Sequence, residues 1–162
     1  SFSPYTPTAA AFEAWKAGLQ AVGIVDHDSI AGGMEMIEAA RALSIGSTVG
    51  FELRVNMSGT GLEGLRLNSP DSQNIAYIVI HGVPAAAFPV VGRFLEPIHE
   101  ARNQRNRRML EALNDMIGDF GIGKLDFAAD VVPLSSADEG GSITERHLLF
   151  ALVHRILASE GC

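Results

Sequence analysis

Residues 23–33 have the sequence GIVDHDSIAGG, in which a charged triplet directly follows an apolar run. The β-branched residues Ile24 and Val25 are typical of a short buried strand, and the glycines after them indicate that the chain turns. The triplet Asp26, His27 and Asp28 therefore lies where a strand is expected to end. Two carboxylates and an imidazole at such a position are a candidate functional site, although Asp28 taken by itself fits a helix N-cap equally well.

The segments around this stretch alternate between helical and strand patterns. Apolar residues at three- and four-residue steps predict helices over residues 8–22 and 29–42. An alternating pattern predicts a strand over residues 47–55, and a nearly continuous apolar run predicts another over residues 75–82, of the kind buried in parallel sheets. Helices and strands that alternate in this way favour an α/β fold with a parallel sheet.

The second half of the chain is mostly helical in pattern. A loop rich in Gly, Ser and Asn precedes it at residues 56–74. Helices are then expected over residues 85–116 and 144–159, while residues 124–132 fit either a short helix or a docking segment. The first of these is expected to break early, at Pro89 and Pro97. It also carries a cluster of arginines, which fits either a solvated face paired with nearby glutamates or a clamp for an anion. The arginines are Arg102, Arg105, Arg107 and Arg108, and the glutamates are Glu96, Glu100 and Glu111.

The composition is that of one globular domain, with 162 residues of which 47% are hydrophobic. A formal net charge of −7 argues against extended binding to duplex DNA. The single cysteine, Cys162, excludes an internal disulfide and fits a reducing compartment. No apolar run reaches the roughly 18–20 residues of a membrane span, and no signal-peptide pattern is visible. We therefore expect a cytoplasmic protein without a membrane partner.

Further chemistry-bearing residues follow the other predicted strands. Glu52 lies in the second strand, His81 ends the third, and His147 opens the last helix. Because the carboxyl ends of parallel strands meet at one edge, these groups are expected to converge with the triplet. Imidazoles and carboxylates together suit zinc, manganese or iron. Each histidine also has a structural interpretation, as a hydrogen-bonded or surface residue, whereas a carboxylate inside an apolar strand needs a partner.

Residues 18–53, GLQAVGIVDHDSIAGGMEMIEAARALSIGSTVGFEL, resemble the second and third motifs of the PHP (polymerase and histidinol phosphatase) domain. Those motifs read T-D-H-D and, further on, G-x-E, and Val25 stands here in place of the threonine. Four other segments resemble later or earlier parts of the phosphoesterase branch in the same order. They are residues 1–15, YIVIHG at 77–82, RNQRNRRMLEALNDMIGDFGI at 102–122 and SITERHLLFALV at 142–153.

The resemblance implies an α/β fold, specifically an incomplete, distorted (β/α)7 barrel of the PHP type with a helical insertion. Residues 1–162 would form a partial PHP domain, with an inserted helical subdomain at about 85–134. The implied activity is metal-dependent hydrolysis of a phosphoester, in a phosphorylated small molecule or in a nucleotide or oligonucleotide. The implied cofactors are divalent ions, which are Mn, Zn, Fe or Mg, and a homo-oligomer is compatible with this interpretation.

The resemblance also implies a role for individual residues. The residues that match metal-ligand positions are His27, Glu52, His81 and His147. Asp26 matches a position that orients a neighbouring ligand. Arg146 corresponds, one residue out of register, to an arginine that holds phosphate.

Parts of the family pattern are absent from this sequence. The first motif, H-x-H, and the last, D-x-H, are not found, and the aspartate expected near residues 3–4 is replaced by Pro4. We therefore expect an interior part of such an enzyme, inactive by itself. The alternative is a non-catalytic α/β module that binds or assembles on a degenerate scaffold. A nucleotide-binding doubly wound domain is disfavoured because neither G-x-G-x-x-G nor G-x-x-x-x-G-K-[ST] occurs.

Overall fold

The computed structural model describes residues 5–69 and 72–159, which form two compact units. The first, Tyr5–Phe88, contains all the strands, and we call it the sheet unit. The second begins at Pro89 and is built from helices, and we call it the helical unit. Within the described residues, no helix combines the length and the apolar character that a membrane crossing requires.

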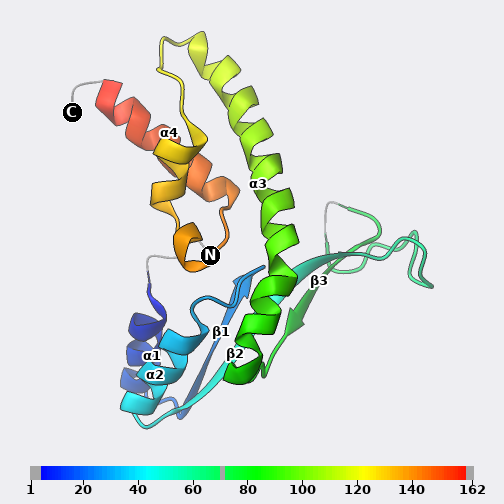
Figure 1. The fold of residues 1–162 in the computed structure, drawn as a ribbon, viewed down its shortest axis with the longest axis vertical. Coiled ribbons are helices and arrows are strands. Elements are labelled where there is room, and N and C mark those ends of the chain that lie inside the picture. The colour runs from blue at the N-terminus through cyan, green and yellow to red at the C-terminus, as the bar shows by residue number, and fades with distance from the viewer. Residues whose placement is uncertain (1–4, 70–71, 160–162) are drawn as a thin grey trace. The chain divides into compact units, whose positions relative to one another are not determined.

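The sheet unit is a small α/β arrangement (Figure 1). Its sheet has three strands in the order β1-β2-β3, in which β1 runs parallel to β2, and β2 runs antiparallel to β3. In chain order the elements are α1 (Pro7–Lys16), β1 (Ala21–His27), α2 (Gly33–Ala42), β2 (Gly46–Asn56), β3 (Ile75–Ile80) and the short 3-10 turn η1 (Ala85–Ala87). The α/β class predicted from the sequence is thus confirmed, while a closed barrel is not shown.

Small side chains decide how α1 and α2 pack. Thr6 caps α1 by accepting the N–H of Ala9 at 3.1 Å, and Pro7 occupies the first turn, where no N–H is needed. The core of the unit is formed by Ala11, Met36 and Val49. An alanine at the contact lets helices approach closely, so the larger apolar residues of α1 are not the ones buried.

Three details of the first half differ from the sequence-based expectations. The first helix ends at Lys16 rather than at residue 22, and Phe12 and Trp15 of its predicted apolar stripe are 47% and 48% exposed. The second helix starts at Gly33, with Gly32 at its N-cap, so Asp28 is not its cap. Instead Asp28 adopts a left-handed backbone with φ of 52°, a conformation that aspartate tolerates better than most residues.

The strand β3 is confirmed, but its predicted burial in a parallel sheet is wrong. It pairs antiparallel with β2 at one edge of the sheet, and Ile78, Val79 and Ile80 are exposed. The reason lies in the connection. Residues 57–69 and 72–74, the described part of this connection, form no helix that could carry the chain across the sheet. The two strands are therefore joined as a long hairpin, and a hairpin is antiparallel.

The helical unit is built around one long helix. Its elements are α3 (Phe88–Gly118), the π-helical turn η2 (Phe127–Val131), the 3-10 turns η3 (Val132–Leu134) and η4 (Ala137–Glu139), and α4 (Glu145–Ser159). The predicted breaks in α3 are not found. Pro89 lies in the first turn, where its missing N–H costs little, and Pro97 is accommodated inside the helix.

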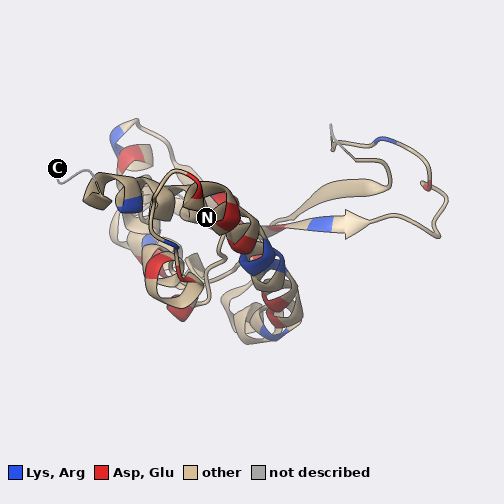
Figure 2. Cartoon of the chain, turned by 90° about the horizontal axis from the view of Figure 1, so that it is seen from above, with Lys and Arg blue, Asp and Glu red and all other residues tan. Residues whose placement is uncertain are grey.

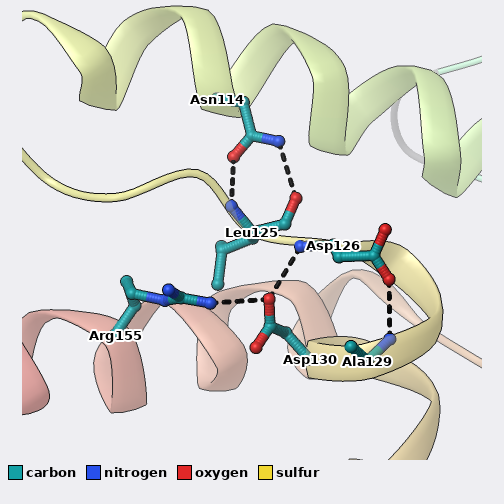
Figure 3. A network of polar contacts seen from close by, with 6 residues as sticks. All are labelled: Asn114, Leu125, Asp126, Ala129, Asp130 and Arg155. Carbon is teal, nitrogen blue, oxygen red and sulfur yellow. Dashed lines mark hydrogen bonds and ion pairs between the residues drawn. The ribbon is translucent and has the colours of Figure 1, made fainter.

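A polar network accompanies the apolar core of the helical unit (Figure 3). Asn114 on α3 bonds through its amide to both the N–H and the C=O of Leu125, each at 2.8 Å. Next to it, Asp130 accepts the N–H of Asp126 and the guanidinium of Arg155, both at 2.7 Å. The network therefore connects α3, the turn η2 and α4. The surrounding core residues are Leu110, Ile117, Leu125, Phe127, Val131, Ile143, Leu148 and Ala151.

Replacing Asn114 by alanine is expected to lower the free energy of unfolding of the helical unit by roughly 1 kcal/mol. The two lost hydrogen bonds are worth about 0.5–1.5 kcal/mol each, and the better helix propensity of alanine offsets part of this. Urea unfolding followed by far-ultraviolet circular dichroism measures the change. The matched control is Asn103→Ala, which makes the same exchange on the same helix, and equal loss in both variants would contradict the role of the amide.

Candidate functional site

The structure joins two of the predicted site residues, His27 and Glu52. His27 is the last residue of β1, and the parallel register places it opposite Glu52 on β2. The Nδ1 of His27 lies 2.7 Å from the Oε1 of Glu52. The His27 side chain is 54% exposed, whereas that of Glu52 is 22% exposed. The carboxylate predicted to need a partner inside the sheet therefore has one.

This contact fixes the chemistry that the His27 ring offers. A carboxylate only accepts hydrogen bonds, so Nδ1 must carry the proton, and Nε2 then holds the lone pair in the neutral ring. Metal-binding histidines use the same arrangement, in which a carboxylate orients the ring and increases its basicity. In this structure the carboxylate that contacts the His27 ring is that of Glu52. Neighbouring residues of a strand point to opposite faces, which places the Asp26 side chain on the other side of the sheet from His27.

Asp28 extends the pairing that holds this site together. Its side chain is buried, and its backbone N–H donates to the carbonyl oxygen of Glu52 at 2.9 Å. The bond continues the β1–β2 pairing one residue beyond His27. Asp28 therefore stabilises the register that brings His27 opposite Glu52.

Gly50 is a residue of the site that sequence reasoning did not single out beyond its place in the G-x-E motif. A Cβ on Gly50 would lie 2.1 Å from the carbonyl oxygen of Ile80 and 3.2 Å from the Cα of His81. The end of β3 thus passes directly against β2 at a position where only glycine fits. Gly50 is what brings the exposed His81 next to the strand that carries Glu52.

His147 lies in the helical unit, where it completes the start of α4. Thr144 precedes the helix and donates its backbone N–H to the Nδ1 of His147 at 2.9 Å, while its Oγ1 lies 3.1 Å from the same nitrogen. The bond from the Thr144 N–H is one half of a capping box, with histidine in the place usually taken by Glu or Gln. The residue is only 3% exposed, and this burial lowers the pKa of His147. Because Nδ1 accepts a hydrogen bond, the proton of the neutral ring is on Nε2.

The arginines of α3 have partners on two helices. Arg107 lies 3.8 Å from Glu100, a pairing expected from the sequence, and its guanidinium also stacks on Phe127 at 4.8 Å. Arg105 pairs with Glu145 of α4 instead of a glutamate on its own helix. Charges of both signs follow each other along α3 (Figure 2), as expected for a solvated face. Arg146 is exposed on α4.

The donor groups do not make up a complete metal site. Among residues 5–69 and 72–159, no group of three or more His, Cys, Asp or Glu side chains is placed to hold a metal ion. A catalytic zinc usually takes three protein ligands, so the His27–Glu52 pair falls short of one. His81 does not join this pair in one metal-binding group, and His147 uses Nδ1 for its helix.

Comparison with known proteins supports the fold. No model of a known protein family matches the chain, and no protein of curated function matches it. A protein assigned as a metal-dependent phosphoesterase from Bifidobacterium adolescentis has a similar structure, with 22% identity and a TM-score of 0.65 over 94% of this chain. An amidohydrolase from Chromobacterium violaceum, solved with sulfate and without metal, has 21% identity and a TM-score of 0.63 over 97%.

The chain spans 46% of the length of each of these two proteins. At such low identities the likeness concerns the fold alone. The chain therefore has a mixed α/β fold similar to that of a metal-dependent phosphoesterase.

Proposed function

We propose that this chain is part of a metal-dependent phosphoric ester hydrolase, to whose metal centre it contributes the His27–Glu52 pair. The observation that carries the proposal is the 2.7 Å contact between the Nδ1 of His27 and Glu52, at the carboxyl end of β1. It prepares an exposed imidazole for a divalent cation at the edge where α/β folds place their sites. The similar fold of a metal-dependent phosphoesterase supports the same conclusion.

The finer features of the proposal come from the PHP resemblance. They are a distorted (β/α)7 barrel, a phosphorylated small molecule or nucleotide as substrate, and Mn, Zn, Fe or Mg as the metal. His81 and His147 remain proposed ligands, Asp26 a proposed orienting residue and Arg146 a proposed phosphate contact. Because the neutral ring of His147 carries its proton on Nε2, binding a metal through that nitrogen would require the proton to move and the bond from the Thr144 N–H to Nδ1 to be given up. A site that includes it therefore needs a rearranged start of α4.

The proposal is tested by titrating Mn²⁺ and Zn²⁺ into the full chain by isothermal calorimetry. Replacing His27 by alanine is expected to weaken binding at least about tenfold, since removal even of groups that merely orient a metal ligand costs about 10–100-fold. The matched control is His154→Ala, which removes an exposed histidine of α4. Binding that is equal in His27→Ala and in the unchanged chain, or absent from both, contradicts the proposal.

A second candidate function is a binding or assembly module without catalysis. It is favoured by the absence, within the described residues, of any metal-sized group of three His, Cys, Asp or Glu side chains. The same titration separates the two functions. A chain that binds no divalent cation fits the module, whereas binding that depends on His27 fits the hydrolase.

A further inference from the structure

The outer edge of β3 is partly closed by a side chain from the preceding loop. Asn68 accepts the N–H of Tyr77 through Oδ1 at 2.8 Å and donates through Nδ2 to the C=O of Tyr77 at 2.7 Å. One amide side chain thus makes the two bonds that a neighbouring strand would make. The backbone N–H of Asn74 donates to the C=O of Leu65 at 3.1 Å, so residues 65–68 run alongside residues 74–77.

The bonds of Tyr77 show which way the backbone N–H and C=O groups of the other residues of β3 point. Residues opposite each other in antiparallel strands alternate between bonded and non-bonded pairs. Tyr77 faces Arg54 and bonds outward to Asn68, so this pair is non-bonded. Two residues further on, the pair of Val79 and Glu52 must also be non-bonded. The N–H and C=O of Val79 therefore point outward, and no hydrogen bond reaches them from residues 5–69 or 72–159.

The open part of the edge suits a second copy of the same strand. Residues 75–80 contain no charged side chain, so pairing of two copies at this edge would bring no like charges of the strand itself together. An antiparallel pair centred on Val79 would place position 79 opposite itself and Tyr77 opposite position 81 of the other copy. While Asn68 bonds the backbone N–H and C=O of Tyr77, only the central pair, Val79 with Val79 of the other copy, can form its hydrogen bonds. Exposed apolar edges of this kind invite pairing between chains unless something blocks them.

We propose that Asn68 is an edge-protecting residue, which prevents β3 from pairing with β3 of a second copy. Its amide bonds the backbone N–H and C=O of Tyr77, so these groups cannot bond a second strand. The part of the β3 edge that remains open is then too short to sustain a pair of strands. Residues 65–68 of the loop between β2 and β3 are held alongside β3 by this contact and by the bond between Asn74 and Leu65.

The test is the self-association of Asn68→Ala, measured by sedimentation velocity over a range of concentrations. Its association constant is expected to be at least about tenfold higher than that of the unchanged chain. This factor corresponds to the net contribution of one or two hydrogen bonds that the backbone of Tyr77 can then make with the second copy. Gln73→Ala, which truncates an exposed amide of the same loop, is expected to behave like the unchanged chain. In the double variant Asn68→Ala with Val79→Lys, the charge on the edge is expected to reverse the increase.

Two results would overturn the proposal. One is a folded Asn68→Ala, checked by circular dichroism, that associates no more than Gln73→Ala. The other needs no variant, since amide hydrogen exchange in the unchanged chain at low concentration must be slow at Tyr77 and fast at Val79. Equal exchange rates at these two amides would show that the N–H of Tyr77 is no better protected than that of Val79. This result would contradict the proposal even if Asn68→Ala failed to fold.

Discussion

Replacing Gly50 by alanine is expected to destabilise the sheet unit by about 2–3 kcal/mol, toward the upper end of what overpacking costs. The new Cβ would lie 2.1 Å from the carbonyl oxygen of Ile80, a backbone atom that cannot rotate away. Relief requires the end of β3 to move off β2, and the partner strand would lose pairing near Phe51 and Ile80. The single tryptophan, Trp15, and both tyrosines belong to the sheet unit, so intrinsic fluorescence during urea unfolding reports on this unit.

Gly61→Ala is the matched control for this change. A Cβ at Gly61 would meet no atom within 4 Å, and its φ is not in the left-handed region, so stability is expected to stay within about 0.5 kcal/mol. Gly33 offers a further comparison, because a Cβ there would meet the ring of Phe88 at 2.7 Å, and a side chain can shift where a carbonyl cannot. A Gly50→Ala chain as stable as Gly61→Ala would contradict the close approach of β3.

The candidate site was predictable where it depends on neighbouring strands in simple register. The step from Asp26, His27 and Asp28 to Glu52 could be inferred because a helical crossover joins two parallel strands and aligns their carboxyl ends. The structure confirms that alignment with His27 opposite Glu52. Which of Asp26 and Glu52 contacts the ring was not predictable, because strand alternation separates Asp26 from His27 only once the strand is known to continue as far as His27.

The antiparallel edge position of β3 could not be predicted from the residues of the strand alone. A run such as residues 75–80 is equally apolar whether it is buried in a parallel sheet or exposed at an edge, so its composition does not distinguish the two. The missing information was in the connection, whose described residues, 57–69 and 72–74, form no helix that could carry the chain to a parallel position. His147 shows a related limit. A histidine three residues after a threonine is not a common capping pattern, so its role depends on burial that the sequence does not reveal.

Acidification is expected to destabilise the helical unit through His147. Burial lowers the pKa of this ring below 6.5, so between 6.5 and the folded pKa the unfolded chain binds more protons than the folded chain. The contribution of the neutral ring to stability is therefore complete above pH 6.5. It decreases as the pH falls below that value, by up to about 1.4 kcal/mol for each pH unit. Protonation would also turn Nδ1 into a donor facing the N–H of Thr144 and break the cap of α4.

The substitution His147→Gln separates this effect from the general acid sensitivity of a protein with 19 Asp and Glu residues. Glutamine keeps an acceptor at the third position of α4 and does not titrate, so the bond from the Thr144 N–H can remain while the pH dependence due to residue 147 disappears. Urea unfolding followed by circular dichroism at pH 7.5, 6.5 and 5.5 should give a smaller acid loss for His147→Gln than for the unchanged chain. His154→Gln, on the exposed side of the same helix, should retain the full loss. Parallel losses in all three chains would mean that the imidazole of His147 is not held neutral by its place at the start of α4.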